Sequence, residues 1–196
     1  MTVQHINSET FVQYILDLEK KKTTIAATAL LGLEQEALIK LIKSHLEKDS
    51  NVIVLAPAVY GIEELAKVSN KSFLKINENT EIPLIDTEKH SDQIFDDYQV
   101  VFFDPDYPEN PTEEQDANFK EKQLIPNIFD KIENTTKHTL IIIQEDFICS
   151  SEIIKRIYAV HRRFKGSTIV ALLSNSSYLN TSAIIANANI NAITVM

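Results

Sequence analysis

The stretch TTIAATALLGLEQEALIKLI, residues 23–42, decides the fold of this chain. Its first part, residues 23–31, is almost wholly apolar and is interpreted as a buried strand. Residues 34–47 follow and predict an amphipathic helix, because apolar side chains recur at the spacing of one helix face. The side chains on that face are Ala37, Leu38, Leu41, Ile42 and His45. A buried strand that runs through a turn into such a helix indicates an α/β fold.

The same alternation continues along the chain. Further strands are predicted at 51–56, 72–76, 81–86, 99–103, 139–143, 168–173 and 192–195. Further helices are predicted at 8–20, 61–69, 119–133, 151–164 and 181–187; the first has Ser8 as N-cap and Phe11, Ile15 and Leu18 on one face. Apolar strands that alternate with helices imply a parallel sheet covered on both faces. The predicted fold class is α/β, a three-layer sandwich with a mainly parallel central sheet, in one domain over residues 1–196.

Composition and charge restrict the class of protein. The 196 residues are 44% hydrophobic, which suffices for one domain with a buried core. The formal net charge of −9 disfavours nucleic acid and anionic membranes as partners, although a local basic patch can still bind either. The sequence has no apolar run long enough to span a membrane and no secretory signal, and Cys149 is its single cysteine. These features predict a cytoplasmic protein without a membrane partner.

The carboxyl ends of the predicted strands are the expected functional positions, because open parallel sheets bind ligands there. Five such ends can be read, at 27–34, 57–60, 104–108, 144–147 and 174–177. The first has the place and length of the phosphate-binding loop G-x-x-x-x-G-K-[ST], whose Lys would fall at Leu33 and whose Ser/Thr would fall at Glu34. Leucine cannot neutralise phosphate charge, and glutamate repels it. A chain with three glycines is also poorly equipped for any glycine-rich cofactor loop.

Taken in order, the strand ends resemble the first RecA-like lobe of a superfamily 2 (DEAD/DEAH-type) helicase. NVIVLAPAVYGIEELAKV, residues 51–68, looks like the strand and helix of the motif that begins with A-P-T. VVFFDPDYPEN, residues 100–110, stands where that family has T-P-G-R. LIIIQEDF, residues 140–147, resembles the D-E-A-D/H strand, and ALLSNSS, residues 171–177, resembles the strand that ends in S-A-T. The resemblance implies a RecA-like fold over nearly the whole chain.

The positions that carry chemistry in that family are changed here. Leu33 replaces the phosphate-binding Lys, and Gln144 stands at the metal-binding Asp of the fourth motif. The segment Asp104-Pro105-Asp106-Tyr107 replaces T-P-G-R and would repel a phosphate backbone. A second lobe, which supplies the arginine finger, does not follow within these residues. The resemblance therefore implies a non-catalytic scaffold or adaptor that acts through protein–protein contacts in a larger assembly. Nucleic-acid processing is one function that such an assembly could have. No catalytic residue, cofactor or metal is predicted.

Two charged segments are the candidate partner-binding surfaces. The helix expected at 151–164 buries an apolar side and turns its cations outward; the basic residues on it and directly after it are Lys155, Arg156, Arg162, Arg163 and Lys165. The acidic, proline-rich loop at 104–116 begins with Asp104, Asp106 and Tyr107. Both segments suit a protein partner or a second copy of the chain. A weak nucleic-acid contact is the alternative for the basic helix.

Other interpretations remain open at this point. A noncanonical nucleotide-dependent enzyme would use Glu145 or Asp104 as its base. Residues 144–196 also resemble the last half of a response-regulator receiver, with Gln144 at the phospho-acceptor position, which would make the chain a pseudo-receiver signalling module. Residues 23–42 would form a helix-turn-helix if their first part were helical, although the second helix would begin with acidic residues. Cys149 is interpreted as a buried structural thiol.

Overall fold

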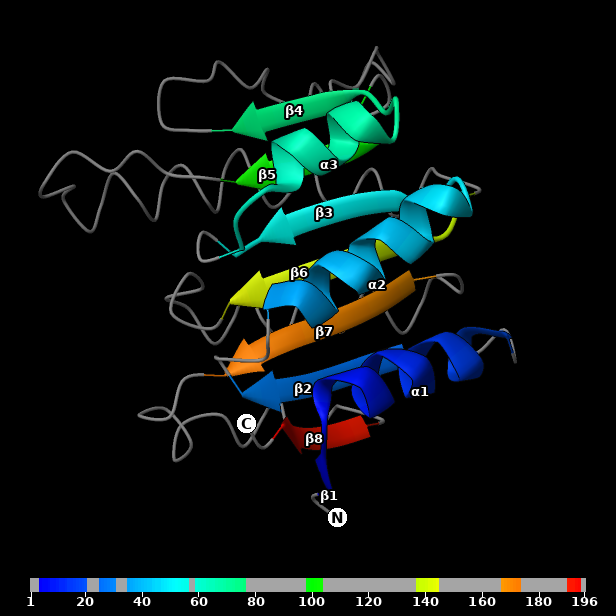
Figure 1. Cartoon of the computed structure of the whole chain (residues 1–196), viewed down its shortest axis with the longest axis vertical. Coiled ribbons are helices and arrows are strands. Elements are labelled where there is room, and N and C mark those ends of the chain that lie inside the picture. Colours follow the sequence, from blue (N-terminus) through cyan, green and yellow to red (C-terminus); the bar gives the residue numbers. More distant parts are fainter. Residues whose placement is uncertain are drawn as a thin grey trace, which may run out of the picture.

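All strands of the described chain run parallel in one sheet (Figure 1). The structure, a computed structural model, describes residues 4–20, 25–30, 35–56, 59–76, 98–103, 137–144, 167–173 and 190–194. The strands in these ranges are β1 Gln4–Ile6, β2 Ile25–Leu30, β3 Asn51–Leu55, β4 Phe73–Ile76, β5 Val100–Phe103, β6 Thr139–Gln144, β7 Ser167–Leu173 and β8 Ile190–Thr194. Their order in the sheet is β1-β8-β2-β7-β6-β3-β5-β4. The α/β class with a parallel sheet is thereby confirmed.

Three helices lie on the same face of the sheet (Figure 1). They are α1 Ser8–Lys20, α2 Gln35–Glu47 and α3 Ile62–Val68. The predicted N-cap of α1 is wrong by one residue, because the side-chain Oδ1 of Asn7 accepts a hydrogen bond from the backbone N–H of Thr10 at 2.8 Å. Asparagine is a strong capping residue, since its short amide reaches the free N–H groups of the first turn.

The core between these helices and the sheet is built from the predicted apolar faces. Phe11 and Ile15 of α1 and Leu41 and Ile42 of α2 are fully buried. They pack in one cluster with every second residue of the strands, namely Val52, Val54, Val100, Phe102, Leu140, Ile142, Val170 and Leu172. The strand residues between them are buried as well, namely Ile53, Leu55, Val101, Ile141, Ile143, Ile169 and Ala171. Burial of both faces explains why these strands are apolar throughout.

The strand order overturns two of the alternative interpretations. Residues Ile25–Leu30 are a strand paired with β7 and β8, so residues 23–42 do not form a helix-turn-helix. In a receiver the strands corresponding to β7 and β8 are neighbours, whereas β2 separates them here. The pseudo-receiver interpretation is therefore wrong.

The sequence predictions missed one strand, and several of the predicted segments lie outside the described residues. β1 was not predicted, because three residues are too short to give a recognisable apolar pattern; it pairs with β8, His5 opposite Ile193. The strand predicted at 81–86 and the helices predicted at 119–133, 151–164 and 181–187 lie outside the described residues. Of the helices that are described, none has the length and apolar character needed to cross a bilayer.

Candidate functional site

The carboxyl ends of the parallel strands meet at one edge of the sheet, as predicted. β2 and β7 end opposite each other, and Gln144 at the end of β6 is paired with Leu172 of β7. The ends of β2 and β6 therefore lie at the same edge of the sheet, with β7 between them. Leu33 and Glu34 themselves lie outside the described residues.

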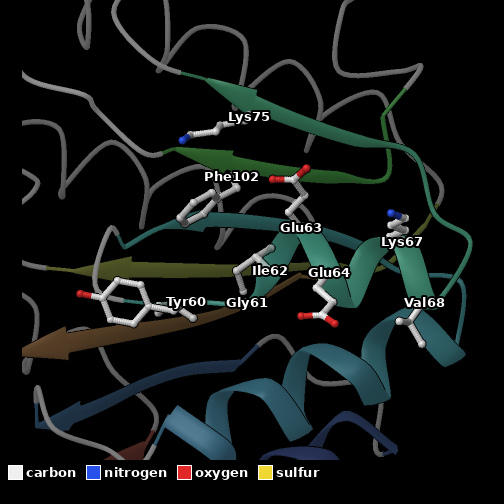
Figure 2. A pocket seen from close by; sticks show the side chains of 10 residues that line it. Tyr60, Gly61, Ile62, Glu63, Glu64, Lys67, Val68, Lys75 and Phe102 are labelled. Atoms are coloured by element: carbon white, nitrogen blue, oxygen red, sulfur yellow. The ribbon is translucent and has the colours of Figure 1, made fainter.

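A groove with a volume of about 810 Å³ lies between α3 and the strands β4 and β5. Figure 2 shows the side chains that line it: Val59, Tyr60, Gly61, Ile62, Glu63, Glu64, Lys67, Val68, Lys75 and Phe102. Tyr60 and Val68 expose 69% and 79% of their surface. They lie at opposite ends of α3, and between them the groove has a charged rim, which makes it a candidate binding surface.

Two features define the backbone of the turn that carries Tyr60, the conformation of Gly61 and a hydrogen bond from α2. Gly61 has φ +78°, a left-handed conformation that glycine adopts without a steric penalty, and α3 begins directly after it. The Gln35 side-chain amide at the start of α2 donates a hydrogen bond to the carbonyl oxygen of Tyr60 at 3.0 Å. This hydrogen bond ties the Tyr60 backbone to α2, and a backbone that is already held loses less entropy when a partner covers the Tyr60 ring.

The candidate partner-binding residues of the sequence analysis lie outside the described residues and stay predictions. They are Lys155, Arg156, Arg162, Arg163 and Lys165 of the basic segment, and Asp104, Asp106 and Tyr107 of the acidic loop. Glu145 and Cys149 lie outside the described residues as well.

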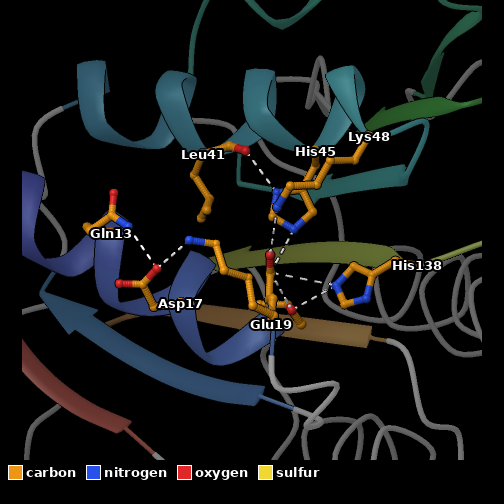
Figure 3. Close-up of polar contacts among 9 residues, drawn as sticks. Gln13, Asp17, Glu19, Leu41, His45, Lys48 and His138 are labelled. Atoms are coloured by element: carbon orange, nitrogen blue, oxygen red, sulfur yellow. Dashed lines mark hydrogen bonds and ion pairs between the residues drawn. The ribbon is translucent and has the colours of Figure 1, made fainter.

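A buried polar cluster lies at the opposite edge of the sheet, near the amino ends of β6 and β7 (Figure 3). Glu19 near the end of α1 is the centre, and its side chain is 8% exposed. His45 of α2 places Nε2 at 2.8 Å from the Glu19 Oε1 atom, and His138 before β6 places Nε2 at 3.6 Å from the same atom. Thr168 of β7 donates its hydroxyl to Glu19 Oε1 at 2.8 Å. Four separate segments thus meet at one carboxylate oxygen.

Hydrogen bonds in this cluster fix the positions of its protons. The carbonyl oxygen of Leu41 can only accept, so the Nδ1 atom of His45, 2.9 Å away, carries a hydrogen. The Nε2 atom of the same ring faces the Glu19 carboxylate, and two lone pairs repel each other at 2.8 Å. At this distance a proton must therefore lie between His45 and Glu19. Because the Thr168 hydroxyl donates to Glu19, it accepts from the Nε2–H of His138 at 2.9 Å.

The surroundings of Glu19 keep its carboxyl group ionised. Burial raises the pKa of Glu19, but hydrogen bonds from His138, His45 and Thr168, together with electrostatic attraction to His45, outweigh burial and hold the pKa well below its usual range. Lys48 adds a positive charge on the outer side, with its Nζ atom 3.4 Å from Glu19 Oε2. The Oε1 atom is left facing the two imidazole rings.

A second charged cluster, on the surface, joins loops at the same edge. The Asp49 carboxylate accepts from Lys137 at 2.8 Å, from Lys71 at 3.0 Å and from Gln99 at 2.9 Å. The hydrogen bond from Lys137, followed by those from Lys71 and Gln99, lowers the pKa of Asp49. Since the Asp49 side chain is 59% exposed, we interpret this cluster as a surface ion-pair network.

The Glu19 cluster was missed by the sequence analysis because its members are far apart in the chain. One signal points to it in retrospect. Glu19 continues the row of Phe11 and Ile15 at intervals of four residues, and His45 does the same after Leu41. A polar residue at the end of a buried row on each of two helices indicates a shared buried contact.

Comparison with known proteins gives no family for this chain. No protein-family model matches it, and no curated protein matches it either. Among solved structures it is similar to the SWI2/SNF2 ATPase core of Sulfolobus solfataricus in complex with double-stranded DNA, with 13% identity and a TM-score of 0.49. The similarity covers 93% of this chain and 35% of the other, so this chain spans about a third of that protein's length. The fold class rests on the strand pairing itself, and this likeness carries no inference about activity.

Proposed function

We propose that this chain is a non-catalytic RecA-like scaffold or adaptor, which acts through protein–protein contacts in a larger assembly. The observation that carries the proposal is Gln144 at the carboxyl end of β6. In this fold class the strand-end edge binds the ligand, and Mg²⁺ with its phosphates needs a carboxylate there. The neutral amide of Gln144 supplies no such charge, and Leu33 and Glu34 after β2 supply no phosphate-binding cation.

A calorimetric titration with ATP, with and without Mg²⁺, tests the non-catalytic part of the proposal. We expect a dissociation constant no tighter than about 1 mM, which corresponds to roughly −4 kcal/mol, because a charge-assisted hydrogen bond to phosphate is worth about 1.5–3 kcal/mol and several are missing. The Gln144→Asp variant, which returns the carboxylate alone, is the matched control and should remain equally weak. Micromolar, Mg²⁺-dependent binding by the unaltered chain would favour the noncanonical enzyme.

Protein contacts are supported by the groove beside α3. It combines the exposed ring of Tyr60 with a rim that carries both charge signs, Glu63 and Glu64 against Lys67 and Lys75. Exposed aromatic anchors within a charged rim are typical of the residues that contribute most to protein interfaces. The basic segment with Arg162 and the acidic loop with Asp104 are the further surfaces that we propose for partners or for a second copy.

Replacing Tyr60 with alanine is expected to weaken association at least tenfold, because truncating an aromatic anchor removes about 2 kcal/mol or more of binding free energy. The measurement is quantitative recovery of co-purifying proteins, together with light scattering for self-association. Tyr14→Ala is the matched control, since Tyr14 is 46% exposed on α1 and does not line the groove.

Charge reversal at Arg162 and Arg163 tests the basic segment in the same assay. If Tyr60→Ala and the charge reversal both leave every association unchanged, neither surface binds a partner and the adaptor role loses its support.

A further inference from the structure

We propose that Glu19, His45 and His138 form a zinc-binding site that ties α1 and α2 to the start of β6. The three ligand atoms, one carboxylate oxygen and two imidazole nitrogens, all lie within 4.8 Å of one another. The site is at the amino-end edge of the sheet, away from the groove, and the inference does not depend on the proposed function.

The donor set matches the chemistry of zinc. Zn²⁺ in proteins is bound by ligand sets that include two imidazoles and one carboxylate, with a fourth position open to water. Tetrahedral ligands at 2.0–2.2 Å from the ion are about 3.3–3.6 Å apart. The 3.6 Å between His138 Nε2 and Glu19 Oε1 already fits, and the 2.8 Å between His45 Nε2 and Glu19 Oε1 must open by about half an ångström to reach that range.

Outer contacts hold two of the three ligands, His45 and Glu19, in the orientation that a metal requires. The Nδ1–H of His45 donates to the Leu41 carbonyl, so its Nε2 lone pair points at the cluster. A metal-bound histidine almost always has such a backbone or carboxylate partner on its other nitrogen. Thr168 donates to Glu19 Oε1, and Lys48 binds the outer oxygen Oε2, which leaves Oε1 as the single ligand atom of the carboxylate.

The position between His45 and Glu19 requires a positive charge in any case, because their lone pairs face each other. A proton on His45 Nε2 is the competing occupant. Zinc differs from it in one respect that can be measured: it also binds His138 Nε2, in place of the hydrogen that this nitrogen donates to Thr168, and the His138 side chain is 27% exposed, on the solvent side of the cluster. A metal site therefore depends on His138, whereas a protonated His45–Glu19 pair does not.

The test uses the full chain, freed of any affinity tag, stripped with a chelator and titrated with ZnCl₂. We expect one zinc per chain by elemental analysis and a rise in Tm of about 5–10 °C at a hundredfold excess over Kd. His138→Gln keeps a hydrogen-bonding group toward Thr168 and should retain the Tm of the stripped protein while it binds zinc at least tenfold more weakly. The control is His161→Gln, the same substitution at a histidine outside the described residues. This variant should bind zinc as tightly as the unaltered chain does.

Cobalt gives a readout that needs no variant. Co²⁺ added to the stripped, unaltered chain should give the intense visible absorption of a tetrahedral site, and Zn²⁺ should remove it. The proposal is overturned if excess zinc leaves Tm unchanged and cobalt shows only the weak spectrum of the hydrated ion. It is equally overturned if His138→Gln and Glu19→Gln both bind zinc as tightly as the unaltered chain.

Discussion

Replacing Glu19 with alanine is expected to destabilise the fold by about 3–5 kcal/mol, even with a chelator present. The change removes the carboxylate that faces His45, whose side chain is 1% exposed, and it leaves the Thr168 hydroxyl without its acceptor. A buried charge or donor that loses its partner keeps its full desolvation penalty. Urea unfolding measures the effect, and a loss of this size lowers the midpoint by roughly 1–5 M at the slope of about 1–3 kcal/mol per M found for small proteins.

Asp17→Ala provides the comparison for that measurement. Asp17 lies on the same helix and also pairs with a cation, Lys20, but its side chain is 49% exposed. An exposed pair of this kind contributes about 0–1 kcal/mol. Similar losses for Glu19→Ala and Asp17→Ala would show that the buried cluster contributes no more than a surface ion pair.

Phe11→Ala is expected to lose about 3–5 kcal/mol of unfolding free energy, the range for removing a buried aromatic ring. Phe11 is fully buried between α1 and the sheet, where it belongs to the same core cluster as Leu41 and Ile42 of α2. The protein's total stability is expected to be about 5–15 kcal/mol, so the variant keeps only part of it. Urea unfolding followed by circular dichroism gives the value.

Tyr14→Ala controls for the loss of an aromatic residue from the same helix. Its ring is 46% exposed, and we expect a change of no more than about 1 kcal/mol. Should Phe11→Ala cost no more than Tyr14→Ala, the packing of α1 against the sheet would differ from the structure described.

The fold was largely predictable because burial on both faces makes the strands of a parallel sheet apolar throughout. The apolar runs at β3, β6 and β7 gave their positions to within a residue or two, and the helical spacing of Leu38 to His45 gave α2. β1 and the N-cap Asn7 were missed, since a three-residue strand has no pattern and Ser8 is as good a capping residue as Asn7.

The sites were less predictable than the fold, because a site is made by residues that the chain brings together from a distance. The strand-end rule placed Gln144 at the correct edge. No comparable rule connects Glu19, His45 and His138, which share no motif and whose approach depends on the sheet order β2-β7-β6 beneath α1 and α2. The groove likewise depends on how α3 packs beside β4 and β5. The sequence of α3 alone does not specify that packing.

The position of β2 in the sheet has a consequence for how the chain folds during synthesis. β2 is completed at Leu30, yet both of its neighbours, Ser167–Leu173 and Ile190–Thr194, lie near the other end of the sequence. At about 5–20 residues per second, the ribosome needs on the order of ten seconds to make the intervening segment. During that time an apolar strand has emerged without either partner, so nascent-chain aggregation or chaperone capture would begin at residues 25–30.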